Sequence, residues 1–403
     1  MSHEGVEKMR NIGVYLGTEP YGGGAFQYDQ SILNALQSLP QDTYRIHAFY
    51  VNDLWEDYLR PFPFLRKKVY TRRQLFDIPG ALFWKMPLCD WSIWEKIGRF
   101  LIGMSSFARQ IDDEHLDLMI FPAQEGYAAG IQTKSISVIH DLMHRYEKFP
   151  EAASPLEVKR REHVYRSICK SSAMIFVDSA VGRDQVVECY GKQYANKLRI
   201  MPFAPPQYLF EQAEDVLPAD VILPPKFIFY PAQFWEHKNH RNLVKAVKLL
   251  QNRGIDVQLV FVGSKKNGYE RTMELIRENH LEANIHVLGY VSDSLMRILY
   301  RSARAMIMPS FFGPTNIPPL EGMAMGCPVA VSRVYAMPWQ VGEAGLTFAP
   351  DDVEEMAETI RKLWQDDNLC KELSAKGKER AQYFSQEKFN GRFVKAIEEV
   401  LEN

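Results

Sequence analysis

Short runs of apolar, mostly β-branched or aromatic residues recur along the chain. Near-continuous runs of this kind are typical of strands that are covered on both faces. Between them, stretches such as 240–253 and 269–280 place apolar residues three and four positions apart, as amphipathic helices do. The alternation predicts α/β folding with parallel sheets and helices on both sides. The predicted strands form two sets, the first at 11–17, 44–51, 116–123, 135–142, 172–179 and 198–205, and the second at 226–233, 256–263, 284–291, 303–310, 327–334 and 345–350.

Two sets of strands indicate two domains, because a chain of 403 residues exceeds what one core usually covers. Residues 205–225 are rich in proline and acidic side chains, and this pattern predicts a linker. We therefore expect a first Rossmann-like domain at 1–207 and a second at 208–384. A last helix at 385–403 is expected to pack back on the first domain.

The overall composition is that of a soluble globular protein, with 46% hydrophobic and 24% charged residues. A net charge near −2 provides no whole-molecule attraction to nucleic acid or to a membrane. The first ten residues lack the apolar run of a signal peptide, so we expect a cytoplasmic protein. The cysteines form no CxxC pair, which favours a reducing compartment and argues against structural zinc; they are Cys89, Cys169, Cys189, Cys327 and Cys370.

Ligands of doubly wound sheets bind at the carboxyl ends of the strands. After the first strand, Gly22, Gly23 and Gly24 precede a predicted helix, where glycine lets the backbone approach a ligand. The loop is not a GxGxxG fingerprint, and a plain flexible turn is the alternative. His140 ends another strand and is suited to bind a polar substrate or to help move a proton. A metal site with His144 would lack a third ligand.

In the second set of strands, Lys238 lies between a strand and a helix, with Asn239 as the expected N-cap. A lysine beside a helix N-terminus forms a compact corner for an anion. A solvated loop lysine is the alternative.

The stretch 309–326 contains four prolines, three of them in a predicted turn at 311–319, which is followed by a short helix expected at 320–325. Pro318 and Pro319 stiffen the turn. Rigid amides at this point favour a diphosphate as charge builds on it. Glu321 is placed to accept hydrogen bonds from ribose hydroxyls, or alternatively interacts with its own helix dipole.

These motifs identify a likeness to a known family. The segment "FFGPTNIPPLEGMAMGCPVAVSRV" resembles the donor-binding region of the family 4 retaining glycosyltransferases of the GT-B type, and "VIHDL", "FVDSAVGRDQVV", "PAQFWEHKNHRNLVKAV" and "VLGYVSD" follow in the family's order. The resemblance implies two Rossmann-like domains facing across a cleft. It also implies a retaining hexosyltransferase that moves a sugar from a nucleotide diphosphate donor to an acceptor hydroxyl.

Site residues follow from the same resemblance. It implies that Lys238 contacts the diphosphate, that Glu321 binds the ribose, and that His140 faces the donor sugar. The catalytic candidates are thus His140, Lys238 and Asn316. The further donor-binding candidates are Gly23, Gly24, Gln233, Tyr290, Val291, Thr315 and Ile317.

Two positions depart from the family's pattern. Gly313 stands where members commonly have a glutamate, eight residues before Glu321, and Gln233 lies in a segment where many have an arginine. The chain has no DxD triplet, so we expect no metal and no cofactor. Leaving-group charge would then be stabilised by Lys238 and by fixed dipoles.

Residues 54–105 mix tryptophans with basic side chains, a mixture that suits an anionic membrane surface or a phosphorylated lipid acceptor. Packing of these aromatics as core is an alternative, and single-stranded nucleic acid is another that nothing else in the sequence supports. The expected partners are a nucleotide-sugar donor and a glycan or lipid-linked acceptor, with peripheral contact to the inner membrane face and no nucleic acid.

We expect a role in polysaccharide or lipopolysaccharide biosynthesis, with GDP-mannose as the preferred donor. Two alternatives stay open: a GT-B sugar-nucleotide epimerase, and a non-catalytic module that binds a sugar nucleotide or a glycan. A phosphorylase is disfavoured, because it would need a pyridoxal lysine and Lys238 is better used on phosphate.

Overall fold

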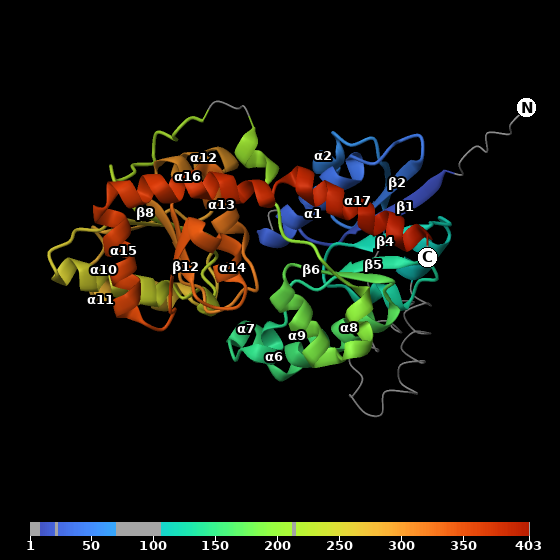
Figure 1. Cartoon of the computed structure of the whole chain (residues 1–403), viewed down its shortest axis with the longest axis horizontal. Helices are drawn as coiled ribbons and strands as arrows, with labels where there is room; N and C mark the ends of the chain where they lie inside the picture. Colours follow the sequence, from blue (N-terminus) through green and yellow to red (C-terminus); the bar gives the residue numbers. More distant parts are fainter. Residues whose placement is uncertain (1–8, 21–22, 70–105, 212–214, 403) are drawn as a thin grey trace, which may run out of the picture. The chain divides into compact units, whose positions relative to one another are not determined.

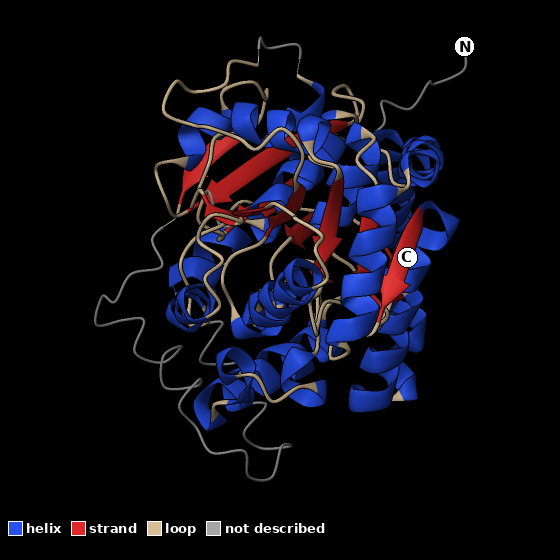
Figure 2. Ribbon diagram, turned by 90° about the vertical axis from the view of Figure 1, so that its left-hand side faces the viewer, coloured by secondary structure: helices blue, strands red, loops and turns tan. Residues whose placement is uncertain are grey.

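The computed structural model describes residues 9–20, 23–69, 106–211 and 215–402. The chain divides into two compact units. The first comprises Met1–Tyr146, Ala152–Pro202 and Phe389–Asn403, and the second comprises Glu147–Glu151 and Phe203–Lys388 (Figure 1). Each unit contains one sheet, whose strands are drawn in red among blue helices in Figure 2.

The sheet of the first unit has seven strands in the order β3-β2-β1-β4-β5-β6-β7. All of its pairs are parallel, and Ile12 of β1 lies opposite Ile46 of β2 and Leu118 of β4. These three side chains are buried, as expected for a sheet that is covered on both faces. The strands are β1 (Arg10–Leu16), β2 (Tyr44–Tyr50), β3 (Leu65–Lys68), β4 (Leu118–Phe121), β5 (Ser135–Val138), β6 (Met174–Val177) and β7 (Leu198–Ile200).

Helices of the first unit begin at polar caps where the sequence supplies them. Ser154 and Ser179 accept hydrogen bonds from the backbone amides of Glu157 and Gly182 and so start α8 and α9. The helices are α1 (Gly24–Gln37), α2 (Trp55–Leu59), α5 (Ser106–Asp112), α6 (Met143–Tyr146), α8 (Pro155–Ser171) and α9 (Ala180–Tyr190), with α7 (Pro150–Ala153) beginning in the second unit and the short 3-10 turns η1 (Gly126–Ala129) and η2 (Lys192–Lys197) between them.

The last helix, α17 (Gln386–Glu402), lies with the first unit from Phe389 onward. Its buried Phe393 packs with Phe176 of β6, their ring centroids 5.9 Å apart. Glu399 forms an ion pair with Arg199 of β7. Apolar contacts spaced along one face thus attach this helix to the sheet of the first unit.

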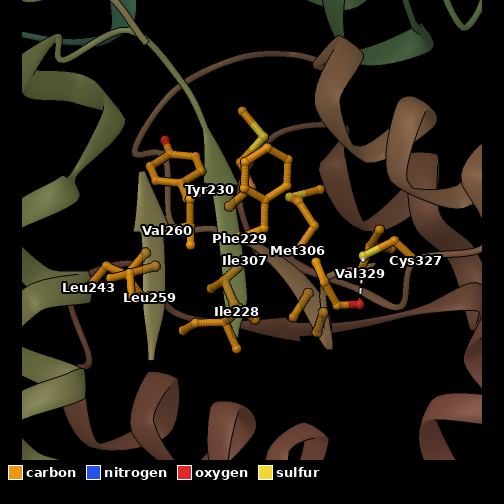
Figure 3. Packing of buried hydrophobic residues seen from close by; sticks show 14 of the residues in the cluster. Ile228, Phe229, Tyr230, Leu243, Leu259, Val260, Met306, Ile307, Cys327 and Val329 are labelled. Carbon is orange, nitrogen blue, oxygen red and sulfur yellow. Dashed lines mark hydrogen bonds between the residues drawn. The ribbon is translucent and has the colours of Figure 1, made fainter. Parts of the chain in front are cut away.

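The sheet of the second unit has six strands in the order β10-β9-β8-β11-β12-β13, all parallel. Its core includes Ile228, Leu259, Met306 and Val329, which converge in Figure 3. The strands are β8 (Ile228–Pro231), β9 (Leu259–Val262), β10 (Ile285–Val287), β11 (Ala305–Met308), β12 (Val329–Ser332) and β13 (Gly345–Phe348).

Helices cover both faces of this second sheet, with α10 and α11 on one side and α12, α13 and α16 on the other (Figure 1). Leu243, Val247 and Leu250 form the buried stripe of α10 at helical spacing. The helices are α10 (His240–Asn252), α11 (Tyr269–Glu278), α12 (Asp293–Ser302), α13 (Ile317–Met325), α14 (Met337–Val341), α15 (Val353–Gln365) and α16 (Asp367–Tyr383), with 3-10 turns η3 (Gln207–Phe210), η4 (Glu236–Lys238) and η5 (Gly342–Ala344).

The predicted linker at 205–225 is partly structured. Tyr208 and Leu209 of η3 are buried in the core of the second unit. Arg297, with 2% of its surface exposed, donates to the Tyr208 carbonyl at 2.8 Å and to the Asp215 carboxylate at 2.7 Å. A buried guanidinium needs such acceptors, and it holds this segment against α12.

The aromatic and basic segment 54–105 is described only as far as residue 69. There, Trp55 is buried and donates its indole N–H to the Thr18 carbonyl at 2.8 Å, so it is a core residue. Lys67 and Lys68 form ion pairs with Glu114 and Asp53. Arg66, also on β3, is exposed. The other residues on which the membrane prediction depends lie outside the described ranges: Arg72, Arg73, Trp84, Trp91 and Trp94. Within those ranges, none of the helices has the length and apolar character needed to cross a bilayer.

Candidate functional site

Lys238 closes the 3-10 turn η4, which follows β8. The next residue, Asn239, has a left-handed backbone with φ 59° and precedes α10. Its side chain forms no hydrogen bond within the helix; its Nδ2 instead donates to the carbonyls of Pro309 and Pro350 at 2.9 and 2.8 Å. Asn239 is thus the N-cap residue of α10, as predicted, but its side chain makes no capping bond and instead ties together the chain after β8, β11 and β13.

The proline-bounded turn ends at Asn316, the N-cap residue of α13. This helix begins at Ile317, three residues earlier than predicted, and includes both prolines in its first turn. Proline is tolerated there because first-turn amides have no partner within the helix. Gln340 of α14 holds the turn: its Oε1 accepts from the Asn316 amide at 3.1 Å and its Nε2 donates to the Asn316 carbonyl at 2.6 Å.

The two loops meet through their side chains. Lys238 Nζ donates to Asn316 Oδ1 at 3.0 Å, and Asn316 Nδ2 lies 3.3 Å from the sulfur of Met337. The ammonium group is thus fixed at the N-terminus of α13, where the partial positive charge of the helix also lies. A full positive charge and the partial charge of a helix N-terminus, held together by the protein, are suited to bind an anion such as a diphosphate.

Gly313 explains how Asn316 fits in this corner. Its φ of +140° is a conformation that L side chains rarely adopt. A Cβ at this position would lie 2.3 Å from Asn316 Nδ2 and 2.8 Å from Oδ1. A glutamate here would therefore displace the Asn316 side chain that Lys238 contacts. Glycine at position 313, where the family commonly has glutamate, therefore makes room for the Asn316 side chain that contacts Lys238.

Glu321 is buried on α13, and both of its oxygens accept hydrogen bonds from tyrosines. Tyr208 donates at 2.8 Å and Tyr300 at 2.5 Å. Burial raises the pKa of Glu321, while the two tyrosine hydroxyls oppose that change. Ribose binding by Glu321 stays a prediction, and it requires that the carboxylate share or exchange these donors.

The other predicted donor-binding residues of the second unit lie at neighbouring strand ends. Gln233 follows β8, and its Oε1 accepts from the Trp235 indole at 2.9 Å. Tyr290 and Val291 follow β10, with 62% of the Tyr290 surface exposed. Thr315 is buried beside Asn316. Their contacts with a nucleotide remain predictions.

In the first unit, Gly23 has φ 72° and precedes α1, of which Gly24 is the first residue. His140 follows β5, lies 3.1 Å from the Pro122 carbonyl through Nε2, and packs edge-on against Tyr28. Burial lowers the pKa of His140 to about 4, although Asp141 opposes the change. His140 is therefore neutral near pH 7 and can exchange hydrogen bonds with a sugar without carrying charge. His144, in contrast, is buried and bonds to Glu162 at 2.8 Å.

The sequence reading missed residues 147–151, a short segment that belongs to the second unit. Glu151 accepts from the backbone amide of His237 at 3.2 Å and also bonds to the ring of His237. Burial would raise the pKa of Glu151, but hydrogen bonds from His237 and Asn267 lower it to about 2. Phe149 stacks on Phe311 of the proline-bounded turn, with ring centroids 5.6 Å apart. The segment therefore buttresses both loops that meet at Lys238.

Two buried carboxyl groups of the first unit also escaped the sequence reading. Asp29 on α1 is 1% exposed, and neither of its carboxylate oxygens has a hydrogen-bond partner among the described residues. Burial raises the pKa of Asp29 to about 8, with Thr18 opposing, and burial followed by the charge of Asp29 raises the pKa of Glu125. Asp29 is one position away from Tyr28, which packs on His140. The sequence did carry one signal for Asp29, because this residue occupies an apolar-face position of the amphipathic helix α1.

Comparison with known proteins gives the context of this site. Residues 219–380 match the model of the family "Glycosyl transferases group 1". O-antigen chain mannosyltransferase B of Escherichia coli is 32% identical over 171 residues, 42% of this chain and 45% of the relative. The MMP alpha-(1->4)-mannosyltransferase of Mycolicibacterium hassiacum is 28% identical over 169 residues, 41% of this chain and 40% of the relative. The matches thus span less than half the length of these curated relatives.

Solved structures extend the likeness of fold to the whole chain. A glycosyltransferase from Rickettsia africae ESF-5 superimposes with a TM-score of 0.72 at 16% identity, covering 98% of this chain and 99% of that one. At this identity the match bears on the fold alone. The Lys238 corner lies inside the region that the family model matches. Residues 219–380 are therefore similar to the group 1 glycosyl transferases, and the chain has the two-sheet GT-B fold.

Proposed function

We propose that the chain transfers a sugar from a nucleotide diphosphate donor to a hydroxyl of a glycan or lipid-linked oligosaccharide, with retention of configuration. The observation that carries this proposal is the Lys238–Asn316 contact at the N-terminus of α13. It places a cation, a helix dipole and a proline-stiffened turn at one point, as stabilisation of a departing diphosphate requires. The family match over residues 219–380 supports the same chemistry.

In the proposed reaction, the bond between the anomeric carbon and the diphosphate oxygen breaks, and a bond to the acceptor oxygen forms on the same face. The acceptor proton passes to an oxygen of the departing diphosphate. Lys238 and the α13 N-terminus stabilise the charge that develops on that group. His140, neutral near pH 7, exchanges hydrogen bonds with the donor sugar and carries no charge that would repel a developing oxocarbenium ion. No metal ion is required in this scheme.

We propose mannose from GDP-mannose as the donor, in polysaccharide or lipopolysaccharide biosynthesis. The support is that both curated relatives described above are named as mannosyltransferases, one of them for an O-antigen chain. The family resemblance implies that Tyr290 and Val291 contact the base of the donor nucleotide.

The test is a turnover assay with a panel of GDP- and UDP-sugars, each with and without a lipid-linked oligosaccharide acceptor. We expect release of nucleoside diphosphate, formation of a glycoside whose one-bond coupling between the anomeric carbon and its proton indicates the same anomer as the donor, and insensitivity to EDTA. Lys238→Gln should abolish turnover, whereas Lys245→Gln, an exposed lysine on α10, should not.

Other outcomes contradict the proposal in distinguishable ways. An isomerised sugar nucleotide formed without acceptor would identify an epimerase. Tight binding of a sugar nucleotide without turnover in any acceptor condition would identify a non-catalytic module. A product of inverted configuration would leave transfer intact and refute retention.

A further inference from the structure

A hollow lies at the opposite edge of the second sheet from Lys238. Its lining includes Lys226, Arg304 and Pro328, which lie one or two residues before the starts of β8, β11 and β12, respectively. The strands of this sheet are parallel, so residues that precede strands lie at the amino edge and residues that follow them lie at the carboxyl edge. The hollow has a volume of about 790 Å³ and is separate from the Lys238 corner.

Positive charge dominates this hollow. The lining carries four cationic side chains and one carboxylate, namely Lys226, Arg304, Lys371, Lys378 and Asp367. Asp367 is engaged by Arg304, whose NH1 lies 2.6 Å from its Oδ1. Lys226 donates to the Trp364 carbonyl at 2.6 Å and lies over the Trp364 ring. One carboxylate thus faces four cations, and the excess is not neutralised within the lining.

Arg304 supplies a donor that the protein leaves unused. Its Nε donates to the Leu363 carbonyl at 2.6 Å, and its NH1 is paired with Asp367. Its NH2 is buried and has no hydrogen-bond partner among the described residues. A buried guanidinium nitrogen without an acceptor is costly, so a ligand that draws the Arg304 side chain outward and offers this nitrogen an acceptor would stabilise the site.

Helix α16 presents further donors to the same hollow. Lys371, Ser374 and Lys378 are spaced three and four residues apart, so they lie along one side of the helix. In the described part of the chain, no ion pair joins either lysine to a carboxylate. The other wall contributes the hydroxyl of Ser302 at the end of α12.

We propose that this hollow, formed by Lys226, Ser302, Arg304, Lys371, Ser374 and Lys378, binds a phosphate-bearing anion. Phosphate oxygens accept hydrogen bonds from guanidinium, ammonium and hydroxyl groups together, which is the donor set present here. The volume is in the range of small-molecule sites and exceeds what a bare phosphate would fill. The hollow has room for a phosphate carried on a larger group, either a free phosphorylated metabolite or a lipid headgroup. The proposal is independent of sugar transfer, because it involves none of the residues placed in the donor corner.

The test compares the full chain with Lys371→Gln/Lys378→Gln and with a control of equal charge change, Lys362→Gln/Lys376→Gln. Lys362 and Lys376 lie on α15 and α16 but do not line the hollow. Binding of glycerol 3-phosphate is measured by calorimetry in Lys238→Gln backgrounds, which separates this site from the donor corner. Co-sedimentation with phosphatidylglycerol vesicles, against phosphatidylcholine vesicles, measures the lipid source.

Loss of two charge-assisted hydrogen bonds should weaken binding about tenfold or more in the hollow variant, and the control should bind as the parent does. Selective loss of glycerol 3-phosphate binding supports a free metabolite, and selective loss of phosphatidylglycerol binding supports a lipid headgroup. Equal binding by all three proteins, or binding of neither probe by the parent chain, would overturn the proposal. Circular dichroism of each variant shows that a loss of binding is not a loss of fold.

Discussion

Replacing Gly313 with alanine tests how the donor corner is built. The new Cβ would lie 2.3 Å from Asn316 Nδ2, well inside contact distance, and the φ of +140° is unfavourable for any L side chain. Holding alanine in such a conformation costs about 1–3 kcal/mol. Asn316 must also move, which breaks the contact with Lys238 at 3.0 Å. Loss of a hydrogen bond to a charged group costs about 1.5–3 kcal/mol.

The two effects together predict that Gly313→Ala lowers the free energy of unfolding of the second unit by about 2.5–6 kcal/mol. Chemical denaturation followed by the fluorescence of the unit's tryptophans measures this change. Donor turnover should fall with it, because Lys238 loses the partner that orients it.

A double-mutant cycle separates the clash from the backbone strain. Asn316→Ala removes the side chain that the new Cβ would meet, so the double variant should be more stable than the sum of the single changes predicts, by about 1 kcal/mol or more. Strict additivity would mean that Asn316 is not held against Gly313, and the explanation given for the missing glutamate would be refuted.

Three further predictions follow from individual contacts. Tyr208→Phe leaves one Glu321 oxygen without its hydrogen-bond donor. Nucleoside diphosphates should then bind more tightly, by about threefold or more, because a ribose hydroxyl takes the place of the tyrosine hydroxyl. Weaker binding in a calorimetric titration would exclude Glu321 as the ribose ligand. Glu151→Gln should weaken GDP or UDP binding, because His237 loses its carboxylate partner. The control Glu147→Gln, which disturbs the contact with Tyr335, should not weaken it. Equal affinities of the two variants in fluorescence titrations would rule out that residues 147–151 support the Lys238 loop. The pKa of Asp29 is about 8 in the folded chain, against an ordinary value of 3.8, so between these pH values the folded state holds a proton that the unfolded state releases. The stability that this proton provides is therefore lost as pH rises from about 4 to 8. Asp29→Asn should flatten the fall in melting temperature over this range, and an unchanged pH profile would contradict a raised pKa of Asp29.

Strand positions could be predicted from the sequence because parallel strands covered on both faces leave an unmistakable apolar pattern. Residues 256–263 were predicted as a strand, and β9 occupies Leu259–Val262. The GT-B fold and its glycosyltransferase relationship were likewise predicted from motifs and confirmed by the comparisons. The predicted helix after the prolines began too late, because first-turn prolines resemble a turn when only residue types are read.

Contacts between segments distant in sequence could not be predicted. Gln340 holds Asn316 from 24 positions away, and Glu151 reaches His237 across 86. Glutamine and glutamate are both common on exposed surfaces, so neither residue type indicates that it will hold a distant loop in place. Glu321 shows a related limit: its position in the motif was clear, but nothing local predicted that Tyr208 and Tyr300 would satisfy it. Tertiary packing decides which polar side chains meet.

The central claim is that the corner formed by Lys238 and the N-terminus of α13 binds a nucleoside diphosphate. Calorimetric titration of GDP and UDP into the parent chain, Lys238→Gln and Lys245→Gln tests it most directly. We expect at least one nucleotide to bind the parent and Lys245→Gln equally, and Lys238→Gln about tenfold or more weakly. Equal affinity of all three proteins for the bound nucleotide would contradict the claim.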